Sequence, residues 1–211
     1  MDYLDLSLES LRIESIHLAK NIATSFRPDI VVYVAKGGYL IGKDIAAYFQ
    51  IPYIGIYAQR EGNEAKAKLA SVLKRLPRVI TKFLRQVELK SGLHKTVKER
   101  QIFWDPDDNC LEKIKDAHKI LLVDDSVDTG YSMKNILPYV FKAVAEPIEI
   151  RIAAINVWSK SESIIRTDFY NYRDTIIATP MSNDSQEHDQ FLQQYANRHD
   201  KQKIKERWAS Q

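Results

Sequence analysis

The 211-residue sequence has a single cysteine, Cys110, and lacks any apolar run that approaches the length of a membrane span. One cysteine excludes an internal disulfide and fits a reducing compartment, so we expect a cytoplasmic protein. A span needs about 20 apolar residues, and residues 1–5, Met-Asp-Tyr-Leu-Asp, lack the basic start of a secretion signal. Internal repeats and low-complexity segments are lacking too. No activating partner can be placed beside Cys110, so we expect a structural role for this thiol.

Acidic residues are scarce in one stretch of the chain. Residues 60–100 contain twelve lysines and arginines against four glutamates, a local balance of +8 within a net charge of +3. The remainder of the chain is therefore mildly acidic, at about −5. With 45% hydrophobic and 28% charged residues the composition is ordinary for a soluble protein, and the length fits a single domain, residues 1–211. The basic stretch needs an explanation of its own.

Strand and helix patterns alternate along the chain. Apolar residues at helical spacing predict a helix over residues 6–25, and a short apolar run predicts a strand over 30–35. A helix over 39–50 and a strand over 52–58 complete a strand–turn–helix–strand order, which is typical of a parallel, doubly wound α/β sheet. Further predictions are strands over 119–123, 148–157 and 175–178, a helix over 132–140, and a helical C-terminal tail at about 186–209.

Residues 120–132, Ile-Leu-Leu-Val-Asp-Asp-Ser-Val-Asp-Thr-Gly-Tyr-Ser, are the most informative part of the chain. Four apolar residues predict a buried strand, Asp124 and Asp125 follow where we expect it to end, and a turn then leads into a helix. Ligands of open α/β sheets bind at the carboxyl ends of strands, and helix starts favour phosphate. Adjacent carboxylates can hold a vicinal diol, while amides and the hydroxyls of Thr129 and Ser132 hold a phosphate one sugar-length away. The segment therefore predicts a site for a ribose 5-phosphate; the alternative is a core strand that ends in a solvated turn.

A second glycine turn, Ala-Lys-Gly-Gly-Tyr, comes one strand–helix unit earlier. Gly37 and Gly38 let the backbone approach a polyanion, and Lys36 adds positive charge. The stretch from Gly37 to Asp44 nearly matches the ATP-binding pattern G-x-x-x-x-G-K-[ST], but Asp44 stands where a hydroxyl that binds Mg²⁺ is needed. We therefore reject a nucleotide hydrolase and expect an anion loop; the alternative is an ordinary turn.

The segment at 120–132 resembles the signature of type I phosphoribosyltransferases, which has four hydrophobic residues, two acids, a short spacer and T-G-x-T/S. The turn at 35–39 resembles the pyrophosphate loop of the same family, whose purine-salvage members carry a similar K-G-G-Y. This resemblance implies that the chain binds 5-phosphoribosyl 1-pyrophosphate (PRPP) and uses Mg²⁺ as cofactor. The residues expected to bind PRPP are Lys36, Gly37, Gly38, Asp124, Asp125, Ser126, Val127, Asp128, Thr129, Gly130, Tyr131 and Ser132.

The same resemblance assigns roles within this set. The 5-phosphate would lie on residues 128–132, the ribose hydroxyls on Asp124 and Asp125, and the pyrophosphate on the glycine turn. Asp128 would remove the proton of the acceptor as the catalytic base; the alternative is that it only caps the turn or the helix. For the metal, Asp124 and Asp125 would act indirectly, and Asp174 aligns loosely with a metal-contacting acid of purine-salvage relatives.

The acceptor side departs from the purine-salvage pattern. Those relatives carry a lysine for the purine's exocyclic oxygen, often within K-P-W-S, and here the matching stretch is Asn-Val-Trp-Ser, with Asn156 in place of the lysine. They also stack an aromatic on the base, commonly within P-W-E, whereas here Pro180 is followed by Met181. The resemblance covers residues 28–180 apart from an insertion. We therefore expect an acceptor other than a common purine.

The insertion, at about residues 59–106, occupies the place of the family's closing loop and is far longer. Within its segment 67–90, apolar residues fall at helical spacing with lysines and arginines between them, which matches an interfacial membrane helix. The alternative is a helical hairpin that packs on the domain or on a second subunit, which would make a homodimer. Nucleic acid is disfavoured because aromatics for stacking are sparse. Lys95, Lys98 and Arg100 are equal candidates for reaching the pyrophosphate.

Three functions follow from these patterns. The preferred one is transfer of 5-phosphoribose to a hydroxyl of a lipid-linked glycan by a cytoplasmic enzyme that is peripheral at the inner face of the membrane. In this the chain resembles the phosphoribosyltransferases that make ribofuranose-containing bacterial polysaccharides. The second is a purine phosphoribosyltransferase with an altered base pocket. The third is a regulator that senses PRPP and binds RNA through the basic stretch.

Overall fold

The structure, a computed structural model, describes residues 3–60, 100–106, 109–145 and 147–198. The chain has two compact units, Met1–Ala58 with Ile102–Gln211, and Gln59–Gln101, and the candidate site lies in the first. The longer strands are β2 (Ile30–Ala35), β3 (Tyr53–Arg60), β4 (Arg100–Trp104), β5 (Lys119–Val127), β6 (Glu149–Val157) and β7 (Phe169–Arg173). The α-helices among the described residues are α1 (Leu8–Ala23), α2 (Tyr39–Phe49), α5 (Cys110–Ile114), α6 (Tyr131–Ala143) and α7 (His188–Ala196).

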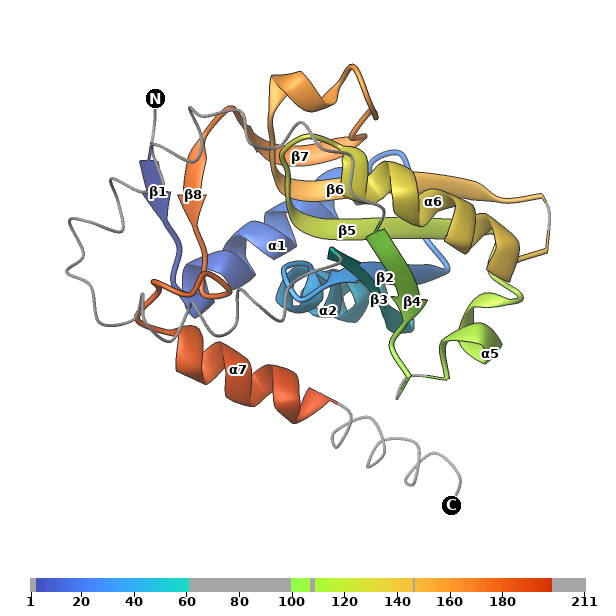
Figure 1. Ribbon diagram of the computed structural model, residues 1–211, viewed down its shortest axis with the longest axis horizontal. Coiled ribbons are helices and arrows are strands. Elements are labelled where there is room, and N and C mark those ends of the chain that lie inside the picture. The colour runs from blue at the N-terminus through green and yellow to red at the C-terminus, as the bar shows by residue number, and fades with distance from the viewer. Residues whose placement is uncertain (1–2, 61–99, 107–108, 146, 199–211) are drawn as a thin grey trace. The chain divides into compact units, whose positions relative to one another are not determined.

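The strands form a six-stranded sheet in the order β4-β3-β2-β5-β6-β7; Figure 1 shows β5, β6 and β7 side by side. β2 pairs in parallel with both β3 and β5, and the pairs β5–β6 and β6–β7 are parallel as well. The chain leaves β2 toward β3 and later returns to β5 on the other side of β2, so the strand order reverses between β2 and β5. Ligands of doubly wound sheets bind at such a switch point. The predicted α/β fold is confirmed.

The main sheet is buried on both faces, as β2 illustrates. Val31 and Tyr33 belong to the core that α1, α2 and α7 share, whereas Ile30, Val32 and Val34 belong to the core that α5 and α6 share. Successive side chains of a strand point to opposite faces of the sheet. An unbroken apolar run therefore fits a parallel strand that is covered on both sides.

α1 begins at a capping box in which Ser7 and Ser10 each accept a hydrogen bond from the other's backbone N–H. Most of its predicted apolar stripe is buried, but Ile13 is 50% exposed. The buried position in that turn belongs to Ser15, whose hydroxyl donates to the Leu11 carbonyl at 2.8 Å. The small hydroxyl is accommodated because the helix backbone satisfies it.

Three strands were not predicted from the sequence: β1 (Tyr3–Asp5), β4 and β7. β1 pairs in parallel with β8 (Ile176–Ala178) in a separate two-stranded sheet, which Figure 1 shows. The strand predicted over 175–178 is thus present but lies outside the main sheet. Residues 100–104, inside the predicted insertion 59–106, form β4, a strand of the main sheet.

Several predicted features fall outside the described residues: the basic amphipathic segment 67–90, the candidates Lys95 and Lys98, and the part of the tail beyond residue 198. α7 is the described part of the predicted tail 186–209. Within the described ranges, no helix has both the length and the apolar character needed to cross a membrane.

Candidate functional site

Asp124 and Asp125 lie inside a strand and not after it. β5 continues to Val127, with Ser126 opposite Asn156 in the ladder with β6. The predicted end of this strand before the acids was wrong, because pairing with β6 outweighs the low strand preference of aspartate. The two acids therefore have well-defined backbone positions at the carboxyl end of the sheet.

The predicted anion loop lies directly against the two acids. A Cβ placed on Gly37 would lie 2.5 Å from Asp125 Oδ1 and 3.1 Å from Asp124 Oδ1, and one placed on Gly38 would overlap the Val123 carbonyl oxygen. Only glycine allows the loop after β2 to come this close to the end of β5. The two turns that the sequence singled out thus meet at the switch point between β2 and β5.

The two carboxylates are half-buried and crowd each other. Asp125 N–H donates to Asp124 Oδ1 at 2.9 Å, and Ser126 N–H donates to Asp125 Oδ1 at 2.9 Å. Burial, and then the charge of Asp125, raise the pKa of Asp124 well above its ordinary value, and burial also raises the pKa of Asp125. The ion pairs among the described residues do not include either carboxylate. A cation or hydroxyl donors brought to the pair would therefore relieve an electrostatic penalty.

The turn after β5 presents hydrogen-bond donors at the same edge of the sheet. Gly130, the N-cap of α6, has a φ of 79°, and a Cβ there would lie 2.7 Å from Ile165 Cγ2. Ser126 Oγ donates to Asp128 Oδ1 at 2.7 Å, and Asp128 is exposed. α6 starts one residue earlier than predicted. Because the first N–H groups of a helix have no partner within the helix, this turn can bind an anion beside the acids.

Asn156, which the sequence resemblance sets against a purine-binding lysine, is bonded to the backbone. The residue is 2% exposed; its Nδ2 donates to the Thr175 carbonyl at 3.0 Å, and its Oδ1 accepts from the Thr175 N–H at 3.4 Å. Met181, which the sequence resemblance sets against a base-stacking aromatic, packs against the core cluster that includes Phe191. Both side chains therefore make their contacts within the fold, Asn156 by hydrogen bonds and Met181 by packing.

Asp174 follows β7, two strands away from β5 in the sheet. Its Oδ1 accepts from the Ser159 N–H at 2.8 Å and its Oδ2 from the Ser159 hydroxyl at 2.5 Å, and these hydrogen bonds lower its pKa. The carboxylate therefore ties the end of β7 to η2 (Ser159–Ser161), the short helix after β6. Its metal contact stays a prediction.

A cluster beside the anion loop was not predicted from the sequence. It consists of Tyr57 in β3, Asp105 after β4, and Tyr195 and Arg198 at the end of α7. The Lys36 Nζ lies 5.5 Å from the centroid of the Tyr195 ring. Tyr57 and Arg198 are 141 positions apart in the sequence, so no local pattern joins them.

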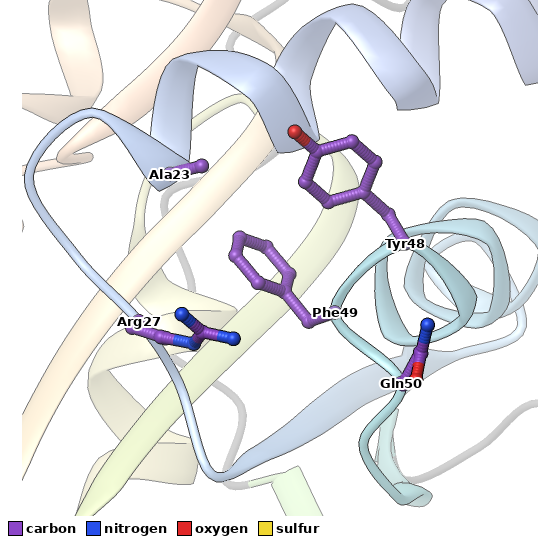
Figure 2. Close-up of a pocket in the computed structure, with 5 residues that line it drawn as sticks. All are labelled: Ala23, Arg27, Tyr48, Phe49 and Gln50. Carbon is purple, nitrogen blue, oxygen red and sulfur yellow. The ribbon is translucent and has the colours of Figure 1, made fainter.

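A pocket of about 370 Å³ lies elsewhere in the same unit, lined by Ala23, Arg27, Tyr48, Phe49 and Gln50. Figure 2 shows Tyr48 and Phe49 reaching from the end of α2 toward the end of α1. These helix ends precede β3 and β2, so the pocket lies at the amino ends of parallel strands. The acids lie at the carboxyl ends, and the pocket is therefore not the predicted site.

Comparison with protein families agrees with this geometry. The sequence matches the family model described as the phosphoribosyl transferase domain over residues 7–189. The chain belongs to this family. No curated protein matches the chain.

Solved structures of phosphoribosyltransferases share the fold at low identity. The xanthine-guanine-hypoxanthine phosphoribosyltransferase of Helicobacter pylori is 17% identical, with a TM-score of 0.59 over 86% of this chain and 95% of that one. A purine phosphoribosyltransferase from Pyrococcus horikoshii is 16% identical, with a TM-score of 0.55 over 88% and 97%. A hypothetical protein from Neisseria gonorrhoeae with bound ppGpp is 13% identical, with a TM-score of 0.55 over 91% and 94%. At these identities the likeness shows the fold alone.

As a phosphoribosyltransferase, the protein is a PRPP-dependent transferase, and the family generally uses PRPP together with Mg²⁺. In the part of the chain that the structure describes, no group of three or more His, Cys, Asp or Glu side chains could hold a metal ion. Mg²⁺ does not require such a group, since it is held by one or two carboxylates together with substrate phosphates and waters. The all-oxygen pair of Asp124 and Asp125 fits that mode.

Proposed function

We propose that the protein transfers 5-phosphoribose from PRPP to a hydroxyl of a glycan acceptor and releases pyrophosphate. The observation that carries the proposal is that the donor side of the site keeps the family pattern while the acceptor side departs from it. On the donor side, Gly37 brings its loop into contact with both acids. On the acceptor side, Asn156 stands in place of the purine-binding lysine and is bonded to Thr175.

In this proposal PRPP binds across the glycine turn after β2 and the turn after β5. The hydroxyls of ribose donate to Asp124 and Asp125, which supplies the half-buried carboxylates with polar partners. The N–H groups and hydroxyls of residues 128–132 bind the 5-phosphate at the start of α6. Lys36 and the glycines after it bind the pyrophosphate. The close approach of the glycine loop to the acids of β5 supports this arrangement, because one PRPP molecule must reach both loops.

The reaction displaces pyrophosphate from C1 through an oxocarbenium-like state, so negative charge builds on the leaving group. Bound Mg²⁺ would neutralise part of that charge, and Lys36 adds a further positive charge. Asp128 is the proposed base: it is exposed, and its Oδ1 is held by the Ser126 hydroxyl. A sugar hydroxyl is a weaker acid than a purine N–H, so the bond at C1 must break ahead of proton removal.

A glycan acceptor would not need the two purine-binding features that are missing from the acceptor side. A sugar hydroxyl needs neither a lysine for an exocyclic oxygen nor an aromatic for stacking, and Asn156 and Met181 stand at those two positions. We expect the glycan to be linked to a lipid, because the basic amphipathic segment 67–90 suits an anionic membrane surface. The enzyme would then act as a peripheral protein at the cytoplasmic face.

A second candidate is a purine phosphoribosyltransferase with an altered base pocket, which the purine enzymes from Pyrococcus horikoshii and Helicobacter pylori among the structural neighbours favour. A third is a PRPP-sensing regulator that binds RNA through the basic stretch 60–100. The neighbour with bound ppGpp indicates that ppGpp should be included among the ligands that are tested.

The proposal is tested by incubating the protein with PRPP and Mg²⁺ and following pyrophosphate release over purines, pyrimidines and free or lipid-linked glycans. We expect release with a glycan, and a loss of about 100-fold or more in Asp128→Ala. The matched control Asp116→Ala removes an exposed carboxylate elsewhere and should behave as wild type. Turnover with hypoxanthine, xanthine or guanine at ordinary enzyme rates would contradict the glycan acceptor. Tight RNA binding without turnover of any acceptor would favour the regulator.

A further inference from the structure

α7 reaches back to the strand ends that flank the anion loop. The hydroxyls of Tyr195 and Tyr57 lie 2.6 Å apart. Tyr57 stands opposite Ala35 in the ladder of β2 and β3, and its ring stacks on Phe103 with the centroids 5.0 Å apart. Tyr195 is therefore anchored beside the residue that directly precedes Lys36.

A buried ion pair fixes the same end of α7. Arg198 donates from Nη2 and Nε to Asp105 Oδ2 at 2.8 and 3.2 Å, and the side chains are 12% and 0% exposed. Asp105 in turn donates its N–H to the Gly55 carbonyl at 2.9 Å. Arg198 also donates to the Tyr195 carbonyl at 2.8 Å and to the Tyr57 hydroxyl at 3.3 Å. Its charge is thus compensated inside the fold, so it does not itself serve as an anion ligand.

The Tyr195 ring meets two cations. The Arg198 Cζ lies 4.1 Å from the ring centroid and the Lys36 Nζ lies 5.5 Å from it. Both are within the range of about 6 Å over which a cation is attracted to an aromatic ring. Tyr39 packs edge-on against the same ring, with the centroids 5.2 Å apart, and so limits its rotation. Since a lysine side chain has many rotamers, this contact favours one position of the ammonium group.

We propose that Tyr195 is a positioning residue of the donor site, whose ring holds the Lys36 ammonium where the pyrophosphate of PRPP binds. The Tyr57 hydroxyl and the pair of Asp105 and Arg198 hold the ring in turn. The inference rests on the proposed role of Lys36 as a pyrophosphate ligand. An ammonium that is already in place binds the leaving group with a smaller loss of conformational entropy.

The inference is tested with three probes in the presence of Mg²⁺: PRPP, pyrophosphate and ribose 5-phosphate. By titration calorimetry, Tyr195→Leu should weaken the first two about three- to tenfold and leave ribose 5-phosphate unchanged. Tyr195→Phe keeps the ring and should keep the affinities. Phe26→Leu, at a core phenylalanine that follows α1 and is 6% exposed, is the matched control for lost packing and should leave all three affinities unchanged.

The same substitution in a Lys36→Met background shows whether the ring acts through the lysine. There Tyr195→Leu should leave the pyrophosphate affinity unchanged, because the group that the ring positions is gone. Equal weakening in both backgrounds, or equal weakening of ribose 5-phosphate, would mean that the ring supports the fold in general, and would overturn the inference while the proposed function stands. If the wild-type protein bound neither PRPP nor pyrophosphate, the proposed function would fail, and the inference with it.

Discussion

Asp124 has a raised pKa because it is buried and lies beside the charge of Asp125, and this affects stability as well as binding. A carboxyl group whose pKa is raised in the folded state stabilises the fold below its unfolded pKa, and that contribution is lost as the pH rises through the folded pKa. At neutral pH, above the unfolded pKa of an aspartate, the group therefore lowers the stability of the fold. The proposed diol contact explains why two adjacent carboxylates are present despite this loss of stability.

We expect Asp124→Asn to raise the melting temperature at neutral pH and to abolish PRPP binding. The gain should be about 2–4 °C for each kcal/mol that is relieved, and it should shrink toward acidic pH, where the wild-type carboxyl becomes protonated. Thermal scans at pH values from acidic to neutral measure the difference in melting temperature between the variant and the wild type. Asp116→Asn is the control at an exposed carboxylate. A difference in melting temperature that did not change with pH would contradict the electrostatic explanation.

We expect Asn156 to contribute to the stability of the fold and not to the binding of PRPP. Asn156→Ala leaves the Thr175 N–H and carbonyl without their side-chain partner in a buried site. We expect a loss of about 1–3 kcal/mol in the free energy of unfolding, measured in urea, with an unchanged affinity for PRPP. Weaker PRPP binding at unchanged stability would instead place Asn156 in the donor site.

At the scale of elements, the sequence predicted those features that depend on neighbours along the chain. The apolar run at 30–35 coincides with β2, because glycines after it and a charged turn before it bound the strand on both sides. The contact between the glycine loop and the acids could also be anticipated, since both turns follow strands that the fold makes neighbours.

The features that sequence reasoning missed depend on distant partners. β5 passes through its two acids because β6 continues to pair with it. The Leu8 N–H, at the start of α1, donates to Glu187 Oε2 from 179 positions away, and the cluster around Tyr195 joins three separate segments. Asn156 was recognised as a departure from the family pattern, but its bond to Thr175 requires the loop after β7 and has no signal in the sequence.

The end of α7 should depend strongly on its ion pair. Arg198→Met removes one partner of an ion pair in which the Asp105 side chain is fully buried, and should destabilise the protein by about 3 kcal/mol. The double variant Arg198→Met with Asp105→Asn should recover part of this loss, because the uncompensated charge is removed. Urea unfolding of the two single variants and the double variant measures the coupling. Additive losses would show that the pair does not interact in solution.

At the scale of the whole molecule, the basic amphipathic segment 67–90 should bring the protein to a membrane surface. We expect the wild-type protein to float with vesicles that contain anionic lipid, and the variant Leu73→Asp with Phe83→Asp to remain unbound. Leu111→Asp, at a leucine that is 60% exposed in α5, is the matched control and should float as wild type does. If the intact protein did not bind vesicles, the membrane contact would be removed from the proposal.

The short sheet of β1 and β8 has a practical consequence for how the enzyme is produced. Tyr3 stands opposite Ile176 and Asp5 opposite Ala178, and the Leu6 N–H donates to the Ala178 carbonyl at 2.9 Å. β8 leads directly into the segment that holds Met181, so residues 3–6 align the backbone that leads to the proposed acceptor side. A fusion tag joined directly before β1, or removal of residues 3–6, would disturb that alignment and would look like a change in acceptor preference. Preparations for acceptor screening should therefore keep residues 3–6 and carry any tag away from β1.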